Sequence, residues 1–403
     1  MPAQVSRLEF IAIMAMLFAT IAFSIDSMLP ALPEIAQELT PDNINNAQLV
    51  LTSFVLGMGV GTLFTGPMSD AWGRKPLVLG GAALYIVGSA LAYYANTLEL
   101  MLVSRVIQGL GAAGPRVVSL AITRDLYSGR AMARIMSFVM MVFTMVPALA
   151  PSIGAVVIAF AGWRAIFIAF ILFSALSCLW LGLRMPETLA RENRVKFRFS
   201  TLKHACQDMA SRPVVVWSII AQSIGFSLIF AMISSVQQIY DVIFDKADSF
   251  PLYFGAIAII SATSSMINAA LVMRLGMRAI VTFVFAAQLV ISTVTLIVAL
   301  SGVGIGTLFV VFLIWQTSVF FTAGLTMGNL NAITMEPLGH IAGSAASVIG
   351  AVSTVIAVLL AAPIGLMFDG TLIPITASYA VLALAGVLVM RHVTRVSDPI
   401  PAE

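Results

Sequence analysis

The chain has 403 residues, of which 60% are hydrophobic and only 10% are charged; its net charge is +3 and its mean hydropathy is +1.03. A soluble domain has about a quarter charged residues, so this composition excludes one and indicates a protein built into a bilayer. Two cysteines, Cys178 and Cys206, provide neither a disulfide framework nor the spacing of a metal site, and the basic residues form no nucleic-acid patch.

Twelve apolar runs follow along the chain, each about long enough to cross a bilayer as a helix. They lie near residues 8–30, 45–65, 77–95, 98–122, 133–159, 163–183, 213–236, 252–273, 279–300, 303–328, 342–367 and 372–390. We therefore predict an all-α membrane protein with twelve transmembrane helices. The first run is too long for the apolar part of a signal peptide and no small-residue cleavage site follows it, so we expect it to stay attached.

The first and fourth runs carry charged residues, which are costly inside a membrane and usually functional there. Counted along the helices, Asp26 and Arg105 both lie roughly 27 Å from the cytoplasmic side, so they could face each other. We predict that Asp26 takes a proton or a substrate group and that Arg105 biases the pKa of this carboxyl. The alternative is a fixed structural ion pair.

Arg116 lies eleven residues after Arg105, which places both arginines on nearly the same helix face, about 16 Å apart. It follows Pro115, which removes a backbone donor and predicts a local break. We expect Arg116 either to line a substrate cavity or to extend toward the cytoplasm as a structural cation. In a cavity it would favour anionic, zwitterionic or strongly polar neutral substrates.

The link between the second and third runs, residues 66–76, combines one acid and two bases with two glycines and two prolines. Gly73 permits a tight backbone turn, and the charges mark a membrane–water boundary. The predicted inner-gate loop comprises Gly66, Asp70, Gly73, Arg74 and Asp125, the last from the end of the fourth run. We expect a salt bridge between Arg74 and Asp125 that holds the gate; the alternative is a purely topogenic role for these charges.

Later runs carry prolines and uncharged polar residues. Pro147 and Pro151, with Gly154 after them, predict a bend in the fifth helix. The candidate cavity-lining residues of the second half are Gln222, Gln237, Gln316 and Asn329. Each of these four could instead make a hydrogen bond between helices.

A long polar segment at residues 185–212 divides the chain into two halves, and one motif of the first half is repeated at the corresponding place in the second. Met273–Arg278 occupies the place in the second half that Asp70–Lys75 occupies in the first, with Gly276 matching Gly73. We predict six-helix bundles at residues 1–184 and 213–403, a cytoplasmic linker at 185–212, and a substrate site at the midplane between the bundles. Because most Lys and Arg fall on one side in this topology, both termini are expected in the cytoplasm.

Four motifs resemble those of a known group of transporters. Asp26–Pro33 resembles D-x-x-L-P-x-L-P of the first helix, Arg105–Gly109 resembles R-x-x-Q-G of the fourth, Arg124–Tyr127 resembles the end of that helix, and Ala342–Ser347 resembles the start of the eleventh. Together with residues 66–76, they are similar to the twelve-span drug:proton antiporters of the major facilitator superfamily, and within these to the Bcr/CflA exporters of bicyclomycin, chloramphenicol and florfenicol.

The resemblance implies a proton site at Asp26 and a twelve-helix fold. The chain departs from the group in two places. The fifth-helix pattern G-P-x-x-G-G is only partly present, as Ala150–Ala155. The Gly-Pro-Arg sequence at residues 114–116 is not expected of this group. The second departure bears on which substrates the protein accepts.

From these features we predict a proton-coupled exporter of small molecules that works by alternating access in the bacterial inner membrane, as a multi-pass monomer in contact with lipid. It would need no cofactor, metal or nucleic acid. The alternatives are a proton-coupled importer of a small metabolite and a membrane sensor that binds a ligand without moving it. No G-x-x-x-x-G-K-[ST] or H-E-x-x-H motif is present, so neither direct ATP drive nor an enzyme is expected.

Overall fold

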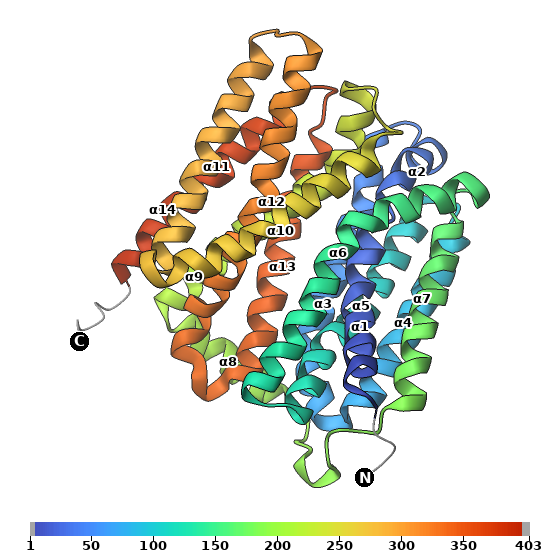
Figure 1. Cartoon of the computed structure of the whole chain (residues 1–403), viewed down its shortest axis with the longest axis vertical. Helices are drawn as coiled ribbons and strands as arrows, with labels where there is room; N and C mark the ends of the chain where they lie inside the picture. The colour runs from blue at the N-terminus through green and yellow to red at the C-terminus, as the bar shows by residue number, and fades with distance from the viewer. Residues whose placement is uncertain (1–4, 397–403) are drawn as a thin grey trace. The chain divides into compact units, whose positions relative to one another are not determined.

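The computed structural model describes residues 5–396, and every regular element in that range is helical (Figure 1). The first half contains α1 (Arg7–Asp26), α2 (Leu32–Leu39), α3 (Leu49–Trp72), α4 (Arg74–Tyr93), α5 (Leu98–Leu126), α6 (Gly129–Ala161), α7 (Ala165–Arg184) and α8 (Phe199–Ala210). The second half contains α9 (Pro213–Gln238), α10 (Phe250–Leu275), α11 (Met277–Leu300), α12 (Ile305–Met335), α13 (Ala342–Leu366) and α14 (Ile373–Val396). Short helical turns are η1 (Leu29–Ala31), η2 (Ile44–Gln48), η3 (Arg191–Asn193), η4 (Ile239–Ile243) and η5 (Glu336–Ile341).

Eleven helical runs in the described chain are long and apolar enough to cross a membrane. One of them, Ile305–Leu366, contains two long helices, α12 and α13, with η5 between them. Counted separately, these make twelve spans, one on each of the apolar runs that hydropathy singles out. The predicted all-α membrane fold is therefore confirmed.

The chain forms two compact units. The first comprises the chain up to Phe199 together with Asp248–Ala256, and the second comprises Ser200–Ala247 together with the chain from Ile257 onward. The boundary at Phe199 lies inside the polar segment 185–212, where α8 forms, and the first turns of α10 belong to the first unit. The division into six-helix bundles at residues 184 and 213 stays a prediction.

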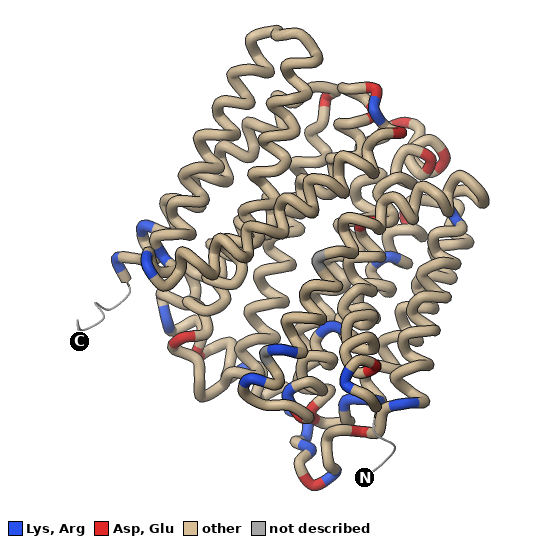
Figure 2. The backbone as a smooth tube through the Cα atoms, in the orientation of Figure 1, with Lys and Arg blue, Asp and Glu red and all other residues tan. Residues whose placement is uncertain are grey.

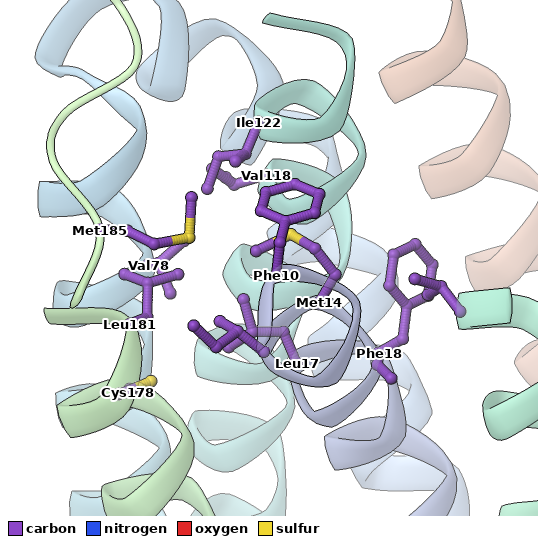
Figure 3. Close-up of a cluster of buried hydrophobic side chains, with 14 of the residues drawn as sticks. Phe10, Met14, Leu17, Phe18, Val78, Val118, Ile122, Cys178, Leu181 and Met185 are labelled. Carbon is purple, nitrogen blue, oxygen red and sulfur yellow. The ribbon is translucent and has the colours of Figure 1, made fainter. Parts of the chain in front are cut away.

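Helices α1, α4, α5 and α7 of the first unit share an apolar core (Figure 3). Phe10 and Met14 of α1 lie there with Val78 of α4, Ile122 of α5 and Leu181 of α7, and none of the five is more than 2% exposed. Because water is absent from such a core, each polar group near it needs a partner within the protein.

Glycines bring the helices of this unit close together. A Cβ atom on Gly61 of α3 would lie 2.9 Å from the Cβ of Ala113 on α5, and one on Gly88 of α4 would lie 2.5 Å from the backbone nitrogen of Gln108. Small residues at interfaces are expected between membrane helices, which pack by close backbone approach. This packing places backbone carbonyl groups of α1 and α3 within reach of polar side chains on α5.

One end of the first unit is rich in cations (Figure 2). It is formed by the starts of α1 and α4 and by the ends of α5 and α7, and it carries Arg7, Arg74, Lys75, Arg124 and Arg184. We call it the basic end. The contact of Arg184 with Glu9, at 2.6 Å between Nε and Oε1, joins α7 to α1 there.

The repeat predicted from the sequence has a structural counterpart in each unit. Gly73 alone separates α3 from α4, with φ 107°, and Gly276 alone separates α10 from α11, with φ 79°. Both backbone conformations favour glycine, because a Cβ atom is strained at such positive φ angles. The two halves thus reverse direction at the same place in the same way.

Candidate functional site

Asp26 is the last residue of α1 and sits in the middle of a polar turn. Ser27 caps the helix by donating its backbone N–H to the carbonyl of Phe23 at 3.2 Å, and η1 then begins at Leu29 with Pro30 in its first turn. The Asp26 side chain is only 4% exposed. Within residues 5–396 its carboxyl group has no ion-pair or hydrogen-bond partner. A buried carboxyl without a partner is unusual in a membrane span and marks a candidate functional site.

Helix α6 packs directly against this turn. A Cβ atom on Gly154 would overlap the carbonyl oxygen of Ser27 and lie 2.9 Å from its carbonyl carbon. Pro147 and Pro151 lie inside the same continuous helix, about two turns and one turn before Gly154, respectively. The three predicted fifth-helix residues therefore belong to the element that supports the backbone next to Asp26.

Arg105 is completely buried and donates hydrogen bonds to three helices. Its Nε bonds the carbonyl of Val50 on α3 at 3.1 Å, its Nη2 bonds the carbonyl of Ser24 on α1 at 3.2 Å, and its Nη1 bonds the side-chain oxygen of Gln108. The guanidinium also lies 4.5 Å from the ring centre of Phe54. Arg105 thus clamps α1, α3 and α5 together without a carboxylate.

The clamp extends to α4 through a chain of neutral hydrogen bonds. Gln108 donates from Nε2 to Ser89 Oγ at 2.7 Å, and Tyr85 and Ser24 share a bond of 2.5 Å between their hydroxyl groups. Gln108 stands in the R-x-x-Q-G motif, three residues from Arg105, so the sequence contained a signal for it. Nothing in the sequence marks Ser24, Tyr85 or Ser89.

The structure does not pair Asp26 with Arg105, although both lie deep in the span. Ser24 turns its hydroxyl toward Tyr85 on α4, and Asp26 leaves the helix about 200° further round. The position of Asp26 on the helix therefore differs from that of Ser24, which joins the polar network that Arg105 enters. No ion pair or hydrogen bond joins the two charges in the described chain, so the alternative of a fixed ion pair is absent from this conformation; Arg105 obtains its partners from two backbone carbonyls and from Gln108.

The second cluster lies at the basic end and centres on Arg74. Its Nε bonds Asp125 Oδ2 at 3.0 Å, and its Nη1 bonds Asp70 Oδ1 at 2.5 Å and Ser69 Oγ at 2.9 Å. The expected Arg74–Asp125 salt bridge is present. Arg74 is only 8% exposed, so the charges hold α3, α4 and α5 together in a partly dry site.

The predicted inner-gate loop is not a loop. Helix α3 continues through Gly66, Pro67 and Asp70 to Trp72, and α4 begins at Arg74. Only Gly73 stands outside a helix. The prolines and glycines suggested a longer link, but membrane helices tolerate Pro67 because neighbouring groups satisfy the freed backbone carbonyl.

Glu187, just after α7, completes this cluster and was missed from the sequence. Its Oε1 accepts the backbone N–H of Arg74 at 2.9 Å, and its Oε2 accepts that of Lys75 at 3.1 Å. The carboxylate thus caps the first turn of α4 from 113 residues away, where the helix dipole favours an anion. The sequence feature that could have indicated this role is that Glu187 is an acid in the mainly basic segment 185–212.

Arg116 lies within α5, one residue after the buried Pro115, and its side chain is exposed. No carboxylate of the described chain pairs with it. It stands ten residues before the end of α5, which places it about 15 Å from the basic end.

The four polar candidates of the second unit do not meet in one place. Gln222 and Gln237 lie fifteen residues apart on α9, about 22 Å along the axis. Gln316 on α12 accepts a hydrogen bond of 2.9 Å from the Tyr240 hydroxyl, whereas Asn329 donates to Asn268 on α10 at 2.7 Å and so joins two helices. Among these four residues, the buried atoms without a hydrogen-bond partner in the described chain are the Oε1 atoms of Gln222 and Gln237 and the Nε2 of Gln316.

Comparison with known proteins identifies the family to which the chain is similar. The profile of the Major Facilitator Superfamily matches residues 12–362. The chain is 27% identical over 402 residues to a bicyclomycin resistance protein homolog of Haemophilus influenzae, with 98% of each chain covered. It is 32% identical over 237 residues to a chloramphenicol resistance protein of Pseudomonas aeruginosa, covering 53% of this chain and 56% of the relative.

A solved structure shows the same fold. The crystal structure of a D-xylose–proton symporter superposes with a TM-score of 0.76 at 15% identity, covering 96% of this chain and 97% of the symporter. The resemblance to the bicyclomycin and chloramphenicol exporters is confirmed at the level of these relatives. With the profile matched over most of its length and long apolar helices throughout, the chain belongs to the Major Facilitator Superfamily and is a multi-pass membrane transporter rather than an enzyme.

Proposed function

We propose that the protein is a proton-coupled antiporter that exports small organic molecules across the bacterial inner membrane by alternating access. The similarity to proteins named for bicyclomycin and chloramphenicol resistance supports export as the direction. The observation that carries the coupling is Asp26, a carboxyl 4% exposed in a membrane span with no partner in the described chain.

An ionised carboxylate without a partner is costly inside a membrane, whereas a protonated one is not. Asp26 therefore holds a proton whenever the protein closes it off from water. When the protein opens to the cytoplasm, water reaches the carboxyl and the proton leaves. Protonation from the periplasm and release to the cytoplasm couple proton entry to one cycle of the transporter.

The cluster around Arg74 supplies the contacts that such a cycle has to make and break. Arg74 bonds Asp70 and Asp125, and Thr188 donates to Asp125 at 3.0 Å. We place the basic end in the cytoplasm, because cytoplasmic loops carry an excess of Lys and Arg. The cluster then stabilises the cytoplasmic ends of α3, α4 and α5 in one state of the gate.

The test uses purified protein in proteoliposomes with an imposed proton gradient and chloramphenicol as the first probe. Wild-type protein should move the probe against the direction of proton flow. Asp26→Asn should abolish proton-driven movement but retain exchange of probe without a gradient, and Asp26→Glu should retain coupling. Asp42→Asn, which changes an exposed acid, is the matched control.

Movement of the probe in the same direction as protons would assign the protein as an importer. Probe binding without movement by the wild-type protein would favour the sensor. Undiminished proton-driven export by Asp26→Asn would remove Asp26 from the mechanism.

A further inference from the structure

Arg116 is a cation inside a membrane span, and no carboxylate of residues 5–396 pairs with it. The two arginines within α5 differ sharply in this respect. Arg105 is buried and its donors are occupied by carbonyl and amide oxygens. The Arg116 side chain is exposed, and within residues 5–396 it has neither an ion pair nor a hydrogen bond.

The carboxylates of the first unit that could neutralise it are engaged elsewhere. Asp70 and Asp125 bond Arg74, and Glu9 bonds Arg184. Asp125, on the same helix, lies nine residues from Arg116, about 13 Å along the axis. The sequence of α1 between Glu9 and Asp26 contains no acid, so that neighbouring helix offers none at this depth.

The exposure of Arg116 is not exposure to lipid. Arg116 lies only about 20° from Arg105 around α5, on the face from which Arg105 contacts α1 and α3. The exposed apolar residues Leu100 and Val103 mark a different side, about 160° and 140° away respectively. An arginine on an inward face that remains accessible borders water rather than hydrocarbon.

Pro115 precedes Arg116 in the sequence and interrupts the backbone hydrogen bonds of α5. It is buried and cannot donate a backbone hydrogen bond to Gly111, four residues earlier. Four residues further along, Ser119 donates its hydroxyl to the Arg116 carbonyl at 2.9 Å, within the same helix. The Gly-Pro-Arg sequence thus forms a defined local structure with a cation at its surface.

We infer that Arg116 binds the anionic group of the transported molecule, so that the preferred substrates are small organic carboxylates, phosphates or zwitterions. This inference rests on the proposed export function and adds the substrate class. A planar guanidinium presents a fork of donors that matches a carboxylate or phosphate in a two-point contact. The incoming anion supplies the charge that the protein lacks.

The experiment measures binding to the full chain in phosphatidylcholine nanodiscs by calorimetry. The probes are three pairs that share a scaffold and differ in one carboxylate: chloramphenicol succinate with chloramphenicol, benzoate with benzamide, and nicotinate with nicotinamide. Wild-type protein should bind at least one acid more tightly than its neutral counterpart. Arg116→Gln should weaken that binding about 10- to 100-fold, as expected for a charge-assisted contact, and leave the neutral compounds unaffected.

Two variants separate recognition from folding. Arg116→Lys keeps the charge without the fork and should recover part of the affinity. Arg130→Gln removes an exposed arginine from the start of α6 and should change nothing. Equal binding of acids and neutral compounds, no acid bound at all, or acid binding that survives Arg116→Gln would each overturn the inference.

A lipid headgroup offers the same chemistry, so the measurement is repeated with phosphatidylglycerol in the discs. Competition by this lipid that depends on Arg116 would assign the site to lipid and overturn a substrate role. The coupling test on Asp26 is independent of these results. Proton-driven export of neutral compounds by Arg116→Gln, lost in Asp26→Asn, would leave the proposed function standing without this inference.

Discussion

The packing of α6 on the turn after Asp26 predicts that Gly154→Ala impairs both stability and transport. The added Cβ atom would overlap the Ser27 carbonyl oxygen and lie 2.9 Å from the carbonyl carbon, whereas carbon atoms in contact prefer about 3.5–4.0 Å. Helix α6 and the turn must therefore separate by about 1 Å. Because both partners of this contact are backbone, no rotamer change can relieve it.

Overpacking of this kind typically costs about 1–3 kcal/mol. We expect a lower melting temperature of the purified protein and, because the turn carries Asp26, a loss of proton-driven transport of about ten-fold or more per folded molecule, as about 1.4 kcal/mol in the barrier produces. The measurements are thermal unfolding in detergent and transport in proteoliposomes, normalised to folded protein.

Gly80→Ala is the matched control. It lies in α4, no atom of a neighbouring element lies within 4 Å of the added Cβ, and alanine favours a helix over glycine. Wild-type melting of Gly154→Ala would refute the close packing. A destabilised Gly154→Ala protein with full transport per folded molecule would refute the role of α6 in positioning Asp26.

Two further predictions concern Arg105 and Asp208. Arg105→Lys should destabilise the first unit by roughly 2–5 kcal/mol, because one ammonium group cannot reach the oxygens of three helices and each bond to a charged donor contributes about 1.5–3 kcal/mol. Thermal unfolding checks this. Arg184→Lys, at an exposed ion pair, is the control and should destabilise the protein much less. In α8, hydrogen bonds from Arg212, and secondarily from His340, hold the pKa of Asp208 below its ordinary value. The contact should therefore stabilise the fold fully above about pH 4, the pKa of an aspartate in the unfolded chain. This stabilisation should be lost as the pH falls through the lower pKa of Asp208 in the folded protein. Hydrogen exchange in α8, corrected for its intrinsic pH dependence, should increase only below about pH 4, and an increase between pH 7 and 5 would contradict the assignment.

The twelve spans, the glycine turn at Gly73 and the presence of a lone acid, Asp26, in the first span all follow from the sequence. Each depends on local physics: the bilayer acts on every helix separately, a positive φ requires a residue without Cβ, and a lone carboxyl in an apolar run is costly wherever it points. The Arg74–Asp125 pair was also predictable, because Arg74 begins one helix and Asp125 lies at the end of the next, on the same side in the predicted topology.

Only the tertiary structure decided the partners of Arg105 and the capping of α4 by Glu187. Arg105 bonds backbone carbonyls of residues 55 and 81 positions away, and a carbonyl group is present at every position, so no residue type in the sequence marks it. Glu187 reaches amides 113 and 112 positions away. The rotation of α1 that turns Ser24 toward α4 is set by packing among several helices, which local sequence patterns do not encode.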